Sequence, residues 1–170
     1  MINNKSCLIF LSKLAEVYPI GRVKYAPGTL ASLVALFFGY YILMIFKINF
    51  FLLFVFIFVI FSYVLCEAHI RVYNKKDPSE VVVDEFAGQF IALLGIINSE
   101  NINHMLISLL LSFILFRFFD ITKIGPIKKF EKLPGGIGII TDDLVAGLFA
   151  FLTQAAILTS ISQPLIIKTL

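Results

Sequence analysis

Long stretches without a charged residue divide this chain, and they constrain its fold more than any other feature. Two of them cover residues 29–46 and 48–66, and a helix of that length nearly crosses the ~30 Å hydrocarbon core of a bilayer. Neither alternates polar and apolar residues as the strands of a membrane barrel do. Because 59% of the residues are hydrophobic, more than the roughly 45–50% of soluble domains, we predict an all-α membrane protein.

Three further uncharged runs cover residues 86–99, 101–116 and 144–167. The run 86–99 is short for a full span, so it is either tilted against its neighbours, in a thinned bilayer, or one half of a re-entrant hairpin with 101–116. The sequence leaves open whether these two runs cross the bilayer completely. In each case, the segments before and after the pair lie on the same side. We therefore predict a small multi-pass protein of about four to five apolar helices, folded as a single domain over residues 1–170.

The distribution of charged residues predicts the orientation of these helices. Five spans that start inside the cell would place residues 1–28, 67–85 and 117–143 on the cytoplasmic face, and these segments hold 12 of the 14 Lys and Arg residues and 10 of the 11 Asp and Glu residues. Such a bias follows the positive-inside rule. The polar face is therefore predicted to be cytoplasmic. No segment combines basic and aromatic residues as nucleic-acid-binding proteins do, so we expect no nucleic-acid partner.

Four carboxylates form two adjacent pairs, Asp84-Glu85 and Asp142-Asp143, and each pair directly precedes an apolar run with a nearby glycine. Adjacent ionised carboxylates repel one another, so a fold that brings both pairs together favours a bound cation. Oxygen ligands suit Mg2+. The helix dipole, which favours acids in a first turn, is an alternative explanation for a single pair. The presence of a second pair in the same arrangement weakens that explanation. All four acids are predicted metal ligands at helix starts, and Gly88 and Gly147 would let the two helices pack closely.

Two glycine-containing segments on the same face are candidates for binding phosphate. A Pro-Gly turn ending at Gly28 predicts that Thr29 is the N-cap of the first span, where free backbone amides suit an anion. The loop with Gly135, Gly136 and Gly138 would let amides approach a phosphate closely. Each signal is weak alone, because every membrane helix needs a start and glycines also simply form turns.

Arg117, Asp120 and Lys123 follow one another at helical spacing where the 101–116 run reaches the cytoplasmic side. Residues three apart lie roughly along one helical face. An acid flanked by an Arg and a Lys is either an ion-paired surface stripe or a phosphate clamp beside a metal ligand. We predict that these three side chains belong to the catalytic site, with Arg117 and Lys123 also contacting substrate.

The remaining candidates for chemistry are few. Cys7 and Cys66 lack metal-ligand spacing, so no disulfide or cysteine metal site is expected. His69 is predicted to face the C-terminal dipole of the second span, and His104 to lie at the opposite interface. Glu67 follows an apolar span by one residue and is kept as an outside candidate for the site.

Taken together, these motifs resemble the phosphatidylglycerophosphatase A family. In family order they are Ala26-Pro27-Gly28-Thr29, Val83-Asp84-Glu85 with Gly88, Phe116-Arg117-Phe118-Phe119-Asp120-Ile121-Thr122-Lys123, Pro126-Ile127, Gly135-Gly136-Ile137-Gly138-Ile139-Ile140, and Asp142-Asp143-Leu144-Val145-Ala146-Gly147. The set spans residues 21–150 and is specific as a whole. Ile124, Gly125 and Ile140 depart from the family pattern, but they affect loop shape and packing and leave the charged residues intact.

The resemblance implies an all-helical, Mg2+-dependent phosphatase that converts phosphatidylglycerophosphate to phosphatidylglycerol at the cytoplasmic face of a bacterial inner membrane. On this hypothesis the four paired acids hold Mg2+. Arg117 and Lys123 neutralise the phosphoryl oxygens, and Thr29 with the 135–138 amides adds hydrogen bonds. The lipid bilayer and the phospholipid substrate are the expected partners. Direct attack by water and a phospho-enzyme formed on a carboxylate both stay open.

Two other classes of protein compete with this hypothesis. A transporter or channel would use carboxylates as cation or proton sites, but it would place them near mid-membrane, whereas these acids gather at one face. A structural membrane subunit would use the charged loops as a partner surface. The sequence leaves homo-oligomerisation through small-residue helix faces open.

Overall fold

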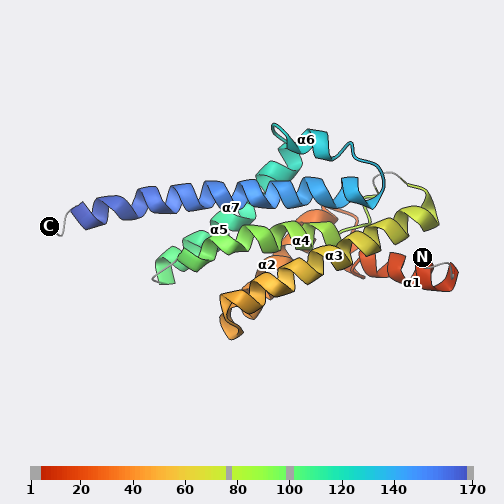
Figure 1. Cartoon of the computed structure of the whole chain (residues 1–170), viewed down its shortest axis with the longest axis horizontal. Helices are drawn as coiled ribbons and strands as arrows, with labels where there is room; N and C mark the ends of the chain where they lie inside the picture. The colour runs from red at the N-terminus through yellow and green to blue at the C-terminus, as the bar shows by residue number, and fades with distance from the viewer. Residues whose placement is uncertain (1–4, 76–77, 99–101, 168–170) are drawn as a thin grey trace.

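The computed structural model describes residues 5–75, 78–98 and 102–167, and in these ranges the chain is helical with no strand (Figure 1). Helices make up 83% of the described residues, which confirms the predicted all-α class. The elements in chain order are α1 (Lys5–Ala15), the 3-10 turn η1 (Ile20–Arg22), α2 (Pro27–Ile45), α3 (Ile48–Tyr73), α4 (Val83–Ala92), the 3-10 turn η2 (Leu93–Asn98), α5 (Ile102–Thr122), α6 (Ile127–Phe130) and α7 (Gly136–Ile167).

Four helical segments are long and apolar enough to cross a membrane: Pro27–Ile45, Ile48–Tyr73, Ile102–Thr122 and Gly136–Ser160. They form an elongated bundle in which α7 runs along most of the length (Figure 1). Large apolar side chains on their outer faces are exposed, for example Phe56 of α3. Such faces are stable against lipid tails and unstable against water. The prediction of a multi-pass membrane protein is therefore confirmed.

The run 86–99 does not form a membrane-length helix. It is divided into the ten-residue α4 and the 3-10 turn η2, and most of α4 is buried among α2, α3 and α7. Phe90 of α4 is fully buried, with ring centroids of Phe54 and Phe58 at 5.4 and 5.0 Å. By contrast, α5 has the length of a full span. Residues before α4 and at the end of α5 lie at the same end of the bundle, as predicted.

Two helices begin earlier than the sequence predicts. α2 begins at Pro27, after Ala26 in a left-handed conformation, so Thr29 is the third helical residue and the prediction of Thr29 as N-cap was wrong. Proline suits a first turn, because its missing N–H has no intrahelical partner there. α7 begins at Gly136, so Asp142 and Asp143 lie in its second turn and not at its start. Residues 136–141 thus belong to the helix, and Ile140 among them is buried.

Gly88 and Gly147 are the contact between α4 and α7. A Cβ on Gly147 would lie 2.3 Å from the Gly88 carbonyl oxygen, and a Cβ on Gly88 would lie 2.7 Å from the Asp143 carbonyl oxygen. Real Cβ atoms do not approach backbone so closely, so only glycine permits this crossing. The predicted close packing is confirmed, and it places Asp84 and Glu85 beside the second turn of α7.

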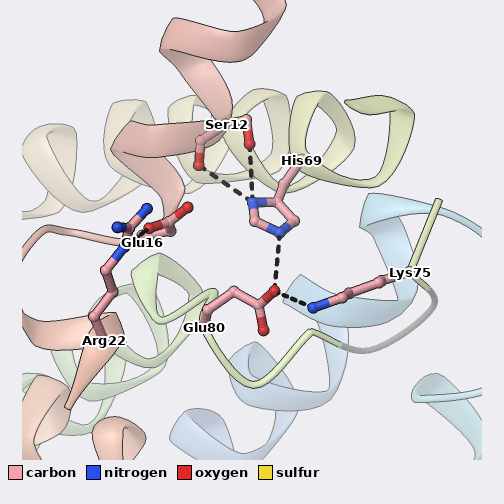
Figure 2. Close-up of polar contacts among 6 residues, drawn as sticks. All are labelled: Ser12, Glu16, Arg22, His69, Lys75 and Glu80. Carbon is pink, nitrogen blue, oxygen red and sulfur yellow. Dashed lines mark hydrogen bonds and ion pairs between the residues drawn. The ribbon is translucent and has the colours of Figure 1, made fainter. Parts of the chain in front are cut away.

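A buried polar network ties α1 and α3 to the segment before α4 (Figure 2). His69 of α3 is fully buried, with Nδ1 at 3.1 Å from Ser12 Oγ and Nε2 at 3.9 Å from Glu80 Oε1. Glu80 also pairs with Lys75, and the Val82 amide donates to the Ala15 carbonyl. His69 therefore joins three segments, and the prediction that it simply faces a helix dipole was wrong.

Candidate active site

The ends of five segments enclose a cavity of about 670 Å³ at the end of the bundle where α4 begins and α5 ends. The first turn of α2 and the segment before α4 form part of its wall. The end of α5, the loop before α7 and the first two turns of α7 form the rest. Its charged lining residues are Asp84, Glu85, Arg117, Asp120, Lys123, Glu131, Lys132, Asp142 and Asp143. The volume lies within the ~300–1,000 Å³ typical of small-molecule sites.

Three carboxylates converge on one point of this cavity. Oxygen atoms of Asp84, Glu85 and Asp143 all lie within 4.8 Å of one another, and both aspartates are buried. α4 places the first two in its first turn, where the helix dipole stabilises negative charge. The Gly88–Gly147 crossing brings the third from α7. These three residues could hold a divalent cation, and they were predicted from the sequence as ligands.

Asp142, the fourth predicted ligand, is not part of this cluster. Its Oδ2 accepts a hydrogen bond from Lys123 Nζ at 2.7 Å. On α7, the Asp142 side chain faces Lys123, whereas Asp143 faces the carboxylates of α4. The structure therefore groups three of the four predicted ligands, whereas Asp142 neutralises a lysine of the cavity wall.

The charge balance within the cluster favours a bound cation. Glu85 Oε2 is buried and has no hydrogen-bond partner among the described residues, although buried polar atoms normally have one. Burial, followed by repulsion from Asp143, raises the pKa of Glu85 to about 8. Burial and then repulsion from Glu85 raise the pKa of Asp84 well above its ordinary value. A divalent cation among these oxygens would remove both penalties.

Arg117 lies beside the first turns of α2. It pairs with Asp120 at 2.6 Å, and its Nη1 donates to Ser32 Oγ at 3.3 Å. Ser32 in turn donates to the Gly28 carbonyl. Among the described residues, none accepts a hydrogen bond from the buried Arg117 Nε, so the protein does not satisfy this guanidinium completely. A Cβ on Gly28 would lie 2.1 Å from Glu85 Oε1, which shows that this predicted substrate-binding residue makes room for Glu85.

Lys123 lies directly after α5 in a left-handed conformation that turns it into the cavity wall. Its Nζ contacts Asp142 at 2.7 Å and Glu131 at 3.1 Å. Burial alone lowers the pKa of Lys123, but the hydrogen bonds and charges of these two acids outweigh burial and raise it above its ordinary value. Lys123 is therefore a fixed positive charge. Arg117, Asp120, Lys123 and Thr29, the predicted catalytic residues, all line the cavity.

In the glycine loop of residues 135–138, fewer backbone amides are free to bind a phosphate than the sequence predicts. Gly135 and Gly138 line the cavity, but the Gly138 amide donates to the Gly135 carbonyl at 3.1 Å. The Gly136 amide donates to Glu67 Oε2 at 3.0 Å. Two of the three amides are thus already bonded within the protein. Glu67 lies outside the cavity lining and satisfies the first turn of α7.

Sequence reasoning missed two contributors to the site. Ser32 holds Arg117 from a position buried inside α2, and no local pattern distinguishes it from other serines of membrane helices. Glu131 pairs with Lys123 across the cavity wall. Its place in a short charged segment was visible, but its partner depends on how the loop folds back.

Comparisons with known proteins found a matching family model and several similar proteins. A family model described as phosphatidylglycerophosphatase A matches residues 13–158. A Haemophilus influenzae protein named phosphatidylglycerophosphatase A is 36% identical over 85% of this chain and 86% of its own length. The Escherichia coli protein of that name is 29% identical over 81% and 77%. A putative phosphatidylinositol-3-phosphatase of Bacteroides thetaiotaomicron is 40% identical over 47% of this chain and 48% of its own. No solved structure matches.

Proposed function

Since the chain belongs to the phosphatidylglycerophosphatase A family and is a phosphatase, we propose that it hydrolyses the terminal phosphate monoester of phosphatidylglycerophosphate, giving phosphatidylglycerol and inorganic phosphate. The observation that carries this proposal is the triad of Asp84, Glu85 and Asp143 within 4.8 Å, in one cavity with Arg117. A cation site beside a guanidinium is suited to a phosphate. Acids for ion conduction would instead lie along a path through the membrane.

Mg2+ is the metal that we propose for this triad. Its ligands are all carboxylate oxygens, which suit a hard divalent ion, and Mg2+ commonly uses one or two carboxylates together with water and substrate phosphate. When bound, Mg2+ would polarise the phosphoryl group and lower the pKa of an attacking water. The buried Oε2 of Glu85 supports this fit, because no described group donates a hydrogen bond to it.

The residues around the triad would orient the substrate. Arg117 is held by Asp120 and Ser32, so its other N–H donors would bind a phosphoryl oxygen without first reorganising the side chain. Lys123, held by Asp142, adds a second fixed positive charge to the cavity lining. The Thr29 hydroxyl would donate a further hydrogen bond from the first turn of α2.

The apolar helices would keep the acyl chains of the substrate in the bilayer while its headgroup enters the cavity. We propose that this cavity faces the cytoplasm in a bacterial inner membrane. The concentration of basic residues in segments 1–28, 67–85 and 117–143 supports this orientation. Protease cleavage of the 124–134 loop in sealed vesicles would test it, because cleavage only from the outer side would reverse the assignment.

The direct test is phosphate release by the purified protein in detergent micelles that contain phosphatidylglycerophosphate. We expect release with Mg2+ and none with excess chelator. Phosphatidylinositol 3-phosphate is the comparison substrate, because one relative carries a name for that activity. Preference for that lipid would transfer the proposal to a different headgroup, and no release from any lipid phosphate by the folded protein would overturn it.

The raised pKa of Glu85 predicts how pH and Mg2+ together affect stability. Because the folded-state pKa of about 8 exceeds the ordinary 4.5, this carboxyl contributes stability below pH 4.5 that is lost as pH rises toward 8. In chelator, the apparent melting temperature should therefore fall over that range. Mg2+ competes with the proton, so its stabilising effect should grow with pH.

Thermal unfolding in detergent with and without Mg2+, at several pH values, measures this effect. Glu85→Gln is the matched variant, because it cannot ionise, and its melting temperature in chelator should depend less on pH. A stabilisation by Mg2+ that is equal at low and high pH in the wild type would contradict the prediction.

A further inference from the structure

We propose that Lys132 binds the second phosphate of the substrate, the diester that joins the glycerol headgroup to the lipid, and so selects lipids that carry two phosphates. This inference rests on the proposed function, which places the terminal monoester at the carboxylate triad. It assigns the recognition of the remainder of the headgroup to the rim of the cavity.

The charge inventory of the cavity distinguishes Lys132 from the other two cations of its lining. Arg117 pairs with Asp120 at 2.6 Å, and Lys123 pairs with both Asp142 and Glu131. Within the described parts of the chain, Lys132 has no carboxylate within 4.0 Å, although it follows Glu131 directly. Its charge is therefore not neutralised by the protein and is available to an anionic ligand.

The position of Lys132 fits a group at the level of lipid headgroups. It is exposed, and Phe130 and Leu133 on either side of it are also exposed, with 37% of each surface accessible. Exposed apolar side chains close to a lysine are typical of the membrane interface, where the lysine stem lies on apolar surface and its ammonium reaches the polar layer. The diester phosphate of a bilayer lipid lies in that layer.

The cavity is also larger than one phosphate needs. Its volume of about 670 Å³ suits a ligand of several groups. The proposed substrate carries two phosphates separated by a three-carbon glycerol unit. With the monoester beside Asp84, Glu85 and Asp143, the diester must lie elsewhere on the wall. Among the cations of the lining, Lys132 is the one whose charge is not already taken by an acid.

Kinetics of Lys132→Gln in mixed micelles test this inference, with phosphatidylglycerophosphate as substrate. We expect KM, expressed as a surface mole fraction, to rise roughly three- to tenfold, as for loss of one partly exposed charge contact, with kcat within about twofold. Inorganic phosphate, which has no diester, should inhibit wild type and variant equally. Lys129→Gln is the matched control, because Lys129 is exposed on α6 and does not line the cavity.

The possible outcomes separate this inference from the proposed function. An unchanged KM in Lys132→Gln overturns the inference, and so does an equal rise in Lys129→Gln, which would indicate a general surface charge effect. Weaker inhibition by inorganic phosphate in Lys132→Gln would place this lysine at the monoester and also overturn it. Absence of phosphate release by the wild type would overturn the proposed function and this inference with it.

Discussion

Asp143→Asn is expected to reduce phosphate release from phosphatidylglycerophosphate by at least about 100-fold. Asp143 is the member of the triad that α7 contributes, and it is almost fully buried. An amide keeps the size of the side chain but removes the charge that would hold a divalent cation. Changes to groups that only support metal ligands already cost about 10–100-fold, so loss of a ligand should cost more.

The same variant should fold and insert normally. In chelator, its apparent melting temperature should be no lower than that of the wild type, because the amide removes repulsion between buried carboxylates. Addition of Mg2+ should stabilise the wild type and leave Asp143→Asn nearly unchanged. The variant thus separates loss of metal binding from loss of structure.

Glu80→Gln is the matched control for Asp143→Asn, since it neutralises an acid that does not line the cavity. Its phosphate release should stay within a few-fold of the wild type, with any change in melting temperature reflecting its contacts with Lys75 and His69. Retained turnover in Asp143→Asn would show that the triad is not the metal site.

Gly147→Ala is expected to lower both stability and activity. By helix propensity alone, alanine should stabilise α7 by up to ~1 kcal/mol. The added Cβ would instead lie 2.3 Å from the Gly88 carbonyl oxygen, which is backbone and cannot rotate away. Separating the two helices should cost about 1–3 kcal/mol. Because the crossing aligns Asp143 with Asp84 and Glu85, we expect at least a tenfold loss of kcat/KM, as misplacement by ~1 Å is costly.

Melting temperature and phosphate release, measured on the same preparation, check this prediction. Leu148→Ala is the control, because Leu148 is the adjacent residue of α7 and its side chain is exposed. That variant should keep its activity. If Gly147→Ala were as active as the wild type and more stable, α4 and α7 would not cross as closely as the structure describes.

Local patterns in the sequence were sufficient for the helices and for most of the site. Uncharged runs predicted the four membrane-length helices, because the hydrophobic requirement of a bilayer acts on each segment separately. Paired acids and nearby glycines predicted Asp84, Glu85 and Asp143, since repulsion between adjacent carboxylates and close glycine packing are both local properties. The helix start at Gly136 was missed because the sequence Pro134-Gly135-Gly136 is equally typical of a loop.

Contacts between distant segments were decided by the tertiary structure. Asp142 and Asp143 are neighbours in sequence, yet the rotation of α7 turns one toward Lys123 and the other toward α4. Ser32 and Arg117 are 85 residues apart and meet only because α2 packs against α5. Such pairings depend on how helices cross, which hydropathy does not encode. The sequence therefore determined which residues carry charge at this end of the bundle, and packing determined which of them act together.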